Sequence, residues 1–183
     1  MKNIKFSICI PNYNYGQYIA ETIQSVLDQT YQNFEIIISD NASTDNSLEV
    51  INSYEDDRIR LVKNAYNIGY SGNVDKATNV AKGDFMILLL ADDMLKPNAL
   101  EDFTKLIDLY SDNDQDLVIC GQIEKTHNNQ VLSISGPKGG MISEKTDKFK
   151  EENFESNNPL VEVYNGLDIF RILMTTNFST PGP

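Results

Sequence analysis

The chain has 183 residues, of which 40% are hydrophobic and 23% are charged. These values are typical of a soluble globular domain, and they exclude a fibrous repeat, a fully disordered chain and a disulfide scaffold. Lys and Arg together number 15 and Asp and Glu number 27, which gives a net charge of −12. An acidic chain repels phosphate backbones, so we expect no nucleic-acid partner.

The cysteines and the apolar runs indicate where the protein resides. Cys9 and Cys120 both lie in apolar runs, as buried structural thiols do, and this favours a reducing compartment. The longest apolar run, residues 85–91, is too short for a membrane span. The first apolar run ends at Pro11 and is too short for a signal peptide. We therefore expect a cytoplasmic protein, free or peripheral at the inner face of the membrane.

Short apolar runs alternate with helical patterns over about 120 residues, which predicts a parallel sheet covered on both faces. The most apolar run, residues 84–90, is expected to be a central strand. Ser43 is the expected N-cap of the second helix, and Gly83 the expected stop of the third. Strands are expected at 6–10, 34–39, 59–62, 84–90 and 117–120, and helices near 19–27, from 43, over 74–81 and from 97 to 110.

The pattern changes after the fifth expected strand. Residues 122–135 indicate a hairpin that turns at His127, Asn128 and Asn129. Residues 136–158 are polar and weakly patterned, which is typical of a mobile loop, and residues 166–174 predict a helix. We therefore expect an α/β core over residues 1–121. Residues 122–183 are expected to begin a second region of the same domain, and this region is expected to be incomplete.

Polar residues follow three of the expected strands at the points where those strands end. The carboxyl ends of parallel strands meet at one edge of a sheet, where open α/β domains bind their ligands. Three separate polar clusters at one edge indicate a binding site more strongly than a single solvated turn would. The clusters are PNYNYG (residues 11–16), Asp40 with Asn41, and Asp92 with Asp93.

Asp92 and Asp93 follow an apolar run, so they are expected at the end of a buried strand. Two adjacent carboxylates repel each other, and a cation relieves that repulsion. Oxygen ligands suit Mg²⁺ or Mn²⁺, so we predict a divalent-cation site here. The alternative is that one Asp caps the helix that begins near Pro97 and the other faces solvent.

The other candidates each have two interpretations. Asp40 and Asn41 offer acceptor oxygens to the imide N–H of uracil or thymine, or they form an Asx turn. Tyr13 and Tyr15 stack on a ring of the ligand or pack over the sheet edge. Gly69 and Asn73 allow substrate to approach the backbone closely, or they belong to an ordinary turn.

Two segments carry a family resemblance: FSICIPNYNYGQYIAETIQSVLDQTYQNFEIIISDNASTDNS and RIRLVKNAYNIGYSGNVDKATNVAKGDFMILLLADDMLKPNALE. They closely resemble the family-2 glycosyltransferases of the GT-A fold over roughly residues 5–103. The resemblance implies an α/β fold of the GT-A type. Such a fold has a Rossmann-like, mostly parallel central sheet with helices on both faces, here followed by a C-terminal hairpin and loop region. The family transfers a sugar from a nucleotide diphosphate to an acceptor hydroxyl, usually with inversion.

The resemblance also implies roles for the candidate residues. Residues 1–121 would bind the nucleotide sugar, and residues 122–183 would begin the acceptor side. Asp93 would be the direct ligand of Mn²⁺ or Mg²⁺, and Asp92 would hold the ribose or the water shell of the metal. Pro11 and Tyr13 would line the base and ribose site. The remaining nucleotide-sugar-binding candidates are Asn14, Asp40, Asn41, Gly69 and Asn73.

The implied donor is a UDP-sugar, with GDP and TDP sugars as alternatives. The implied acceptor is a glycan or a lipid-linked glycan, in cell-surface polysaccharide synthesis. Asn41 stands where many relatives have a second acid, which weakens the argument for uracil, and we expect N41D to shift preference toward uracil if this position faces the base. Asn73-Val74-Asp75 replaces a common Ala-Arg-Asn, so a phosphate-binding arginine is missing and the metal gains importance.

No residue of this chain matches the family's catalytic base. In relatives that acid follows a segment like NFSTPGP, with which this chain ends, so we expect the base beyond residue 183. A non-catalytic nucleotide-sugar-binding module is therefore the alternative to an active glycosyltransferase. A nucleotidyltransferase would need a basic Gly-rich loop after the first strand, and a receiver-like domain would need acids there. PNYNYG offers neither.

Overall fold

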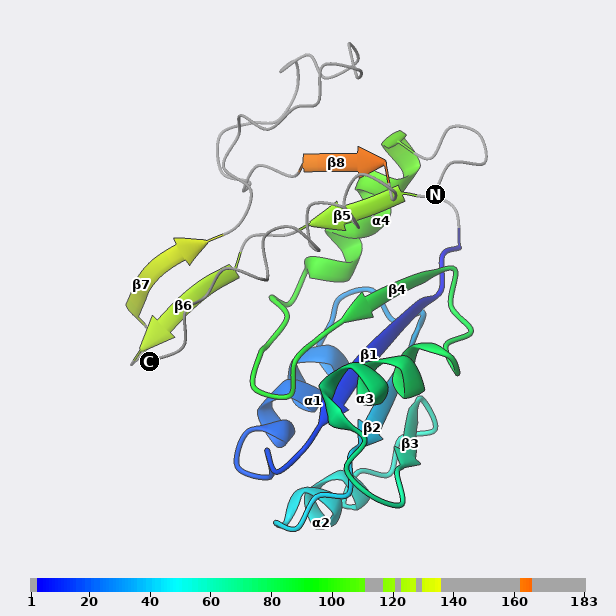
Figure 1. Cartoon of the computed structure of the whole chain (residues 1–183). Helices are drawn as coiled ribbons and strands as arrows, with labels where there is room; N and C mark the ends of the chain where they lie inside the picture. Colours follow the sequence, from blue (N-terminus) through cyan, green and yellow to red (C-terminus); the bar gives the residue numbers. More distant parts are fainter. Residues whose placement is uncertain (1–2, 111–116, 121–122, 128–129, 136–161, 166–183) are drawn as a thin grey trace. The chain divides into compact units, whose positions relative to one another are not determined.

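The computed structural model describes residues 3–110, 117–120, 123–127, 130–135 and 162–165 (Figure 1). The chain divides into two compact units, Met1–Asp108 and Leu109–Pro183. The loop expected at 136–158 and the helix expected at 166–174 lie outside the described residues.

The first unit contains a four-stranded parallel sheet in the order β3-β2-β1-β4. Its strands are β1 (Phe6–Asn12), β2 (Phe34–Asp40), β3 (Ile59–Lys63) and β4 (Phe85–Leu88). It also contains the helices α1 (Ile19–Leu27), α2 (Ser47–Asn52) and α3 (Gly69–Thr78), and all but the last two residues of α4 (Ala99–Tyr110). The alternation of strands and helices confirms the predicted α/β class.

The strand order places helices on both faces of this sheet. Right-handed crossovers from β1 to β2 and from β2 to β3 put α1 and α2 on one face, and the return from β3 to β4 puts α3 on the other. Figure 1 shows α3 lying across β1 and β2. On that face Cys9 and Ile37 pack against Ala77, and all three are fully buried. This burial raises the pKa of the Cys9 thiol to about 11, as expected for a structural thiol.

Strand β4 was expected to be central, and within the described residues it has a single neighbouring strand. It pairs with β1 and forms the end of the four-stranded sheet. Met86 and Leu88 alternate with more buried neighbours and are 52% and 45% exposed. Apolar composition predicts that a strand can be buried, but it does not say how many neighbours the strand pairs with.

The starts and ends of two helices also differ from expectation. Helix α2 begins at Ser47, and the Ser43 hydroxyl accepts a hydrogen bond from the Asn14 backbone N–H at 2.9 Å, so Ser43 is not the helix cap. Helix α3 runs from Gly69 to Thr78, so Gly83 is not its stop. Gly83 instead lies against β1, where its N–H donates to the Ser7 hydroxyl at 2.8 Å.

The second unit contains two described two-stranded antiparallel sheets. Strand β6 (Ile123–His127) pairs with β7 (Gln130–Ser135), which confirms the predicted hairpin. Strand β5 (Leu117–Cys120) pairs with β8 (Glu162–Asn165). Strand β5 was expected to continue the parallel alternation, but its described pairing is antiparallel.

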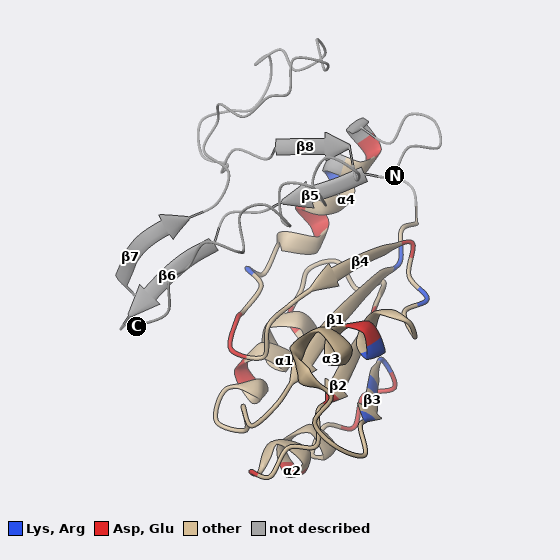
Figure 2. Ribbon diagram, in the orientation of Figure 1, with Lys and Arg blue, Asp and Glu red and all other residues tan. Residues whose placement is uncertain are grey.

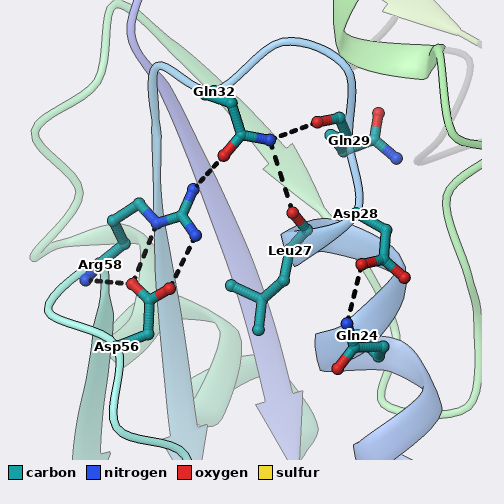
Figure 3. A network of polar contacts seen from close by, with 7 residues as sticks. All are labelled: Gln24, Leu27, Asp28, Gln29, Gln32, Asp56 and Arg58. Atoms are coloured by element: carbon teal, nitrogen blue, oxygen red, sulfur yellow. Dashed lines mark hydrogen bonds and ion pairs between the residues drawn. The ribbon is translucent and has the colours of Figure 1, made fainter.

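A cluster of polar contacts around Arg58 joins the start of β3 to the loop before β2 (Figure 3). The Arg58 guanidinium donates to both carboxylate oxygens of Asp56, at 3.0 and 2.7 Å, and to Gln32 Oε1 at 2.6 Å. It also lies 4.5 Å from the centroid of the Phe34 ring. Figure 3 shows Gln32 linking this pair to the end of α1. The cluster holds the amino ends of β2 and β3 together, at the end of the strands opposite the predicted site.

The Asp56 ion pair predicts a pH-dependent stability. Hydrogen bonds from Arg58 lower the pKa of Asp56 to about 2. A lowered carboxyl pKa adds stability above the unfolded-state pKa of about 3.9, and that stability is lost as pH falls toward about 2. The pair lies at the surface, so we expect Asp56→Asn to cost only about 0.5–1 kcal/mol at neutral pH. Urea denaturation measures this, and a cost that does not shrink on acidification would contradict the assignment.

Candidate functional site

A pocket of about 390 Å³ opens at the carboxyl ends of the strands in the first unit. The ends of β1 and β2, the loop before α3, the start of α3 and the residues after β4 all contribute to its walls. Among the described residues that line it, none is Lys or Arg and one, Asp92, is acidic. The lining residues are Pro11, Asn12, Tyr13, Tyr15, Asn41, Asn67, Gly69, Tyr70, Asn73, Leu90, Ala91 and Asp92.

The pocket brings together six of the nine predicted site residues: Pro11, Tyr13, Asn41, Gly69, Asn73 and Asp92. The other three are Asn14, Asp40 and Asp93, which adjoin lining residues in the chain but do not line the pocket. Tyr15, which the sequence offered with Tyr13 as a residue that stacks on a ring, also lines the pocket. The sequence did not single out Asn67, Tyr70, Leu90 or Ala91 as binding residues, and Asn12 was named only as part of the PNYNYG cluster.

Asp40 joins two loops beneath the pocket. It is 1% exposed, and both of its carboxylate oxygens accept hydrogen bonds from the protein. The Asn12 side-chain amide donates to one oxygen at 2.8 Å, and the Ser43 backbone N–H donates to the other at 3.0 Å. Asn14 adds to this junction, because its side-chain oxygen accepts the Thr44 N–H at 2.7 Å. Asp40 and Asn14 thus hold the loops after β1 and β2 together.

Asn73 fixes the start of α3 to the strand ends. It is 2% exposed, and its oxygen accepts hydrogen bonds from the Ser39 hydroxyl at 2.7 Å and the Asn64 amide at 3.0 Å. Its own amide donates to the Asn12 backbone carbonyl at 3.2 Å. These bonds connect one side chain to β1, to β2 and to the residue that follows β3. Asn73 therefore fixes the relative positions of three walls of the pocket.

Asn12 has one buried polar atom without a partner. The residue is fully buried, and its Oδ1 has no hydrogen-bond partner among the described residues. The amide cannot be turned round to remove the problem, because its nitrogen faces the acceptor-only Asp40 carboxylate. An unpaired buried carbonyl costs about 1–3 kcal/mol. Asn12 thus combines a place in the pocket lining with a buried acceptor atom that no described group satisfies.

The acidic pair lies after β4, and Figure 2 shows acidic residues on the loop between β4 and α4. Asp92 is exposed and lines the pocket, whereas Asp93 is half-buried. Burial, and then the charge of Asp92, raises the pKa of Asp93, so the folded protein disfavours its ionised form. No group of three or more His, Cys, Asp or Glu that could hold a metal occurs in the described part of the chain. A carboxylate pair nevertheless fits Mg²⁺ or Mn²⁺, which use one or two carboxylates together with waters and phosphate oxygens.

Aromatic rings surround the pocket opening. Tyr13 and Tyr15 are 41% and 37% exposed, and Tyr70 is 61% exposed, although all three line the pocket. Exposed rings in a pocket lining offer flat surfaces for a base or a sugar ring. Together with the acidic pair and the buried amides, they form a site for a ligand that has a flat ring, hydrogen-bond donors and a cation-binding group.

A parallel sheet with a ligand pocket at the carboxyl ends of its strands defines an α/β ligand-binding domain. The sequence model of the family described as "Glycosyl transferase family 2" matches residues 7–164. The chain therefore belongs to glycosyltransferase family 2, as its motifs predicted.

Two curated relatives illustrate this relationship. The chain is 35% identical over 115 residues to glycosyltransferase GlyG of Streptococcus pneumoniae, covering 62% of this chain and 37% of that protein. It is 44% identical over 87 residues to the Escherichia coli UDP-Glc:alpha-D-GlcNAc-diphosphoundecaprenol beta-1,3-glucosyltransferase WfaP, covering 48% of this chain and 35% of that protein. The chain thus spans little more than a third of the length of these relatives.

Solved structures support the GT-A fold. Residues 1–349 of S. aureus TarS in complex with UDP-GlcNAc superpose with a TM-score of 0.62 at 25% identity, covering 74% of this chain and 37% of that one. The mannosyltransferase PcManGT of Pyrobaculum calidifontis, in complex with GDP-Man and Mn²⁺, has a TM-score of 0.57 at 19% identity and shows the fold alone. It covers 68% of this chain and 37% of that one. Within the described residues, no helix is long and apolar enough to cross a membrane.

Proposed function

We propose that this chain carries the nucleotide-sugar-binding part of an inverting, metal-dependent glycosyltransferase. It moves a hexosyl group from a nucleotide diphosphate to a hydroxyl of a glycan or lipid-linked acceptor, in cell-surface polysaccharide synthesis. The carrying observation is the pocket of asparagines and tyrosines at the strand ends, with an acidic pair beside it and no described Lys or Arg in its lining. Such a pocket repels a bare diphosphate but accepts one that arrives with a divalent cation.

In this proposal Asp93 and Asp92 hold Mn²⁺ or Mg²⁺. When bound, such a cation would supply Lewis-acid chemistry by offsetting the charge of the donor diphosphate and of the departing nucleotide. The residues of the chain position the donor. Asp40, Asn14 and Asn73 fix the loops, and the carboxylate pair orients the diphosphate end of the donor at the exit from β4.

The nucleoside occupies the amide-lined part of the pocket. Pro11 and Tyr13 line the base and ribose. Gly69 has a φ of +79°, which favours glycine, and its lack of a side chain lets the ligand approach the backbone. The diphosphate has only acceptor oxygens, so a donor group of the ligand that reaches the unpaired Asn12 Oδ1 comes from the base, the ribose or the transferred sugar.

The relatives favour a uridine nucleotide. The name of WfaP specifies UDP-Glc, and TarS was solved with UDP-GlcNAc, whereas PcManGT was solved with GDP-Man. We propose UDP as the carrier, with GDP or TDP as the alternative. A lipid-linked acceptor is also consistent with the WfaP name, and it would place the protein in the cytoplasm at the inner face of the membrane. The catalytic base is proposed to lie beyond residue 183.

A thermal-shift panel tests this proposal. We expect UDP and UDP-glucose with Mn²⁺ to raise the melting temperature, GDP and TDP to raise it less, and UDP with EDTA to have little effect. Stabilisation by ligand follows mass action, about 2.7 kcal/mol at a ligand concentration of 100 times Kd. If no nucleotide diphosphate shifts the melting temperature with Mn²⁺, the proposed function is wrong.

A further inference from the structure

The loop between β3 and α3 carries part of the pocket wall, and it is anchored by one buried side chain. Asn67 and Gly69 of this loop line the pocket, and Tyr70 follows directly. Asn41, at the end of β2, is 3% exposed and lies beneath the loop. Its side chain makes four hydrogen bonds, which use every donor and acceptor position that an amide has.

The backbone of the loop fixes the orientation of this amide. The Ile68 N–H can only donate, and it donates to Asn41 Oδ1 at 2.9 Å. The Gly69 carbonyl can only accept, and it faces Asn41 Nδ2 at 3.3 Å. Turning the amide round would set a donor against a donor and an acceptor against an acceptor. The oxygen of Asn41 therefore faces the Ile68 N–H, and its nitrogen faces the Gly69 carbonyl.

Two other asparagines complete the arrangement. The Asn64 amide donates to Asn41 Oδ1 at 3.2 Å, and Asn41 Nδ2 donates to Asn67 Oδ1 at 2.8 Å. Asn67 Oδ1 also accepts the Gly69 N–H at 2.8 Å. The side chain at position 41 thus needs to donate and to accept hydrogen bonds. The side-chain oxygen at position 67 only accepts them.

We infer that Asn41 is the positioning residue that holds residues 64–69 as a wall of the nucleotide pocket, and that it does not read the base. This inference rests on the proposed function for its ligand. It separates two asparagine-to-aspartate changes that look equivalent in the sequence. In Asn41→Asp a carboxylate oxygen faces two acceptors, Asn67 Oδ1 and the Gly69 carbonyl. In Asn67→Asp the new carboxylate meets two donors and fits.

Stability and hydrogen exchange measure the loop itself. We expect Asn41→Asp to melt about 5 °C below Asn67→Asp. We also expect the amides of residues 64–69 to exchange about tenfold faster in Asn41→Asp than in Asn67→Asp. Equal melting temperatures and equal exchange in the two variants would overturn the inference.

Nucleotide affinity shows whether Asn41 positions the pocket wall or only stabilises the fold. At a temperature where every variant is folded, we expect Asn41→Asp to bind UDP with Mn²⁺ about tenfold more weakly, with GDP weakened equally. Asn3→Asp is the charge control, because Asn3 is exposed at the other end of β1 and its oxygen already accepts a bond from Asn33. It should bind UDP as the wild type does.

Two outcomes distinguish the alternatives. If Asn41→Asp keeps the wild-type melting temperature and exchange but reverses the preference between UDP and GDP, Asn41 reads the base and the inference is wrong. If the wild type binds neither nucleotide while the exchange difference between the two variants persists, the proposed function fails and the role of Asn41 in holding the loop is supported.

Discussion

Replacing Asp93 with alanine is expected to abolish Mn²⁺-dependent binding of UDP, with a loss of affinity of about 100-fold or more. Even residues in the outer shell of a metal cost 10- to 100-fold when removed, and Asp93 is proposed as a direct ligand. Isothermal titration calorimetry of UDP with and without Mn²⁺ measures the effect. Wild-type affinity that is the same in both conditions would contradict the metal site.

A measurement of stability distinguishes this loss of UDP affinity from unfolding of the variant. Burial and the charge of Asp92 raise the pKa of Asp93, so its ionised carboxylate is unfavourable in the folded protein without a cation. The Asp93→Ala variant should therefore be at least as stable as the wild type. Asp57→Ala is the matched control, because Asp57 is exposed in the turn before β3, at the opposite end of the strands from the pocket. It removes the same charge and should leave UDP binding unchanged.

Replacing Gly83 with alanine is expected to give the largest loss of stability. A Cβ at this position would lie 2.6 Å from the Lys5 carbonyl oxygen and 2.7 Å from the Ser7 nitrogen. Both are backbone atoms of the segment that leads into and forms β1, which cannot move without disturbing the centre of the sheet. We expect a cost of about 3 kcal/mol in the free energy of unfolding, measured by urea denaturation.

Gly72→Ala provides the contrast to this change. Its Cβ would meet only the flexible Ile68 side chain, at 3.2 Å, and Gly72 lies within α3. Alanine favours the helix by up to about 1 kcal/mol, so this variant should be neutral or slightly stabilised. Similar unfolding free energies for the two variants would show that the close approach of Gly83 to β1 does not constrain the fold.

The sequence predicted best the elements whose burial repeats regularly along the chain. Helix α1 buries Ile19, Ile23 and Val26 on one face, and this spacing marked the helix. Strand β4 shows the limit of such reasoning, because its apolar run suggested a central strand while its described pairing is with β1 alone. The number of neighbours a strand has is decided by topology, which local composition does not encode.

The location of the site could also be predicted, but not its hydrogen bonds. Polar residues after three strands had to share one edge of the sheet, so Tyr13, Asn41 and Asp92 were expected together, and all three line the pocket. The partners of Asn41 depend on the path of the loop after β3, including the positive φ of Gly69. A buried amide and a base-reading amide are identical in sequence, and only coordinates separate them.

The central claim is that the cation and the nucleotide share the pocket at the carboxyl ends of β1, β2 and β4. Paramagnetic broadening by Mn²⁺ in the presence of UDP, observed in amide NMR spectra, tests it most directly. We expect the signals of Asp92, Asp93 and the pocket residues Asn12 and Gly69 to broaden, while those of Lys82 and Gly83 near the amino end of β1 stay sharp. Broadening centred on the amino ends of the strands, or broadening unchanged by UDP, would contradict it.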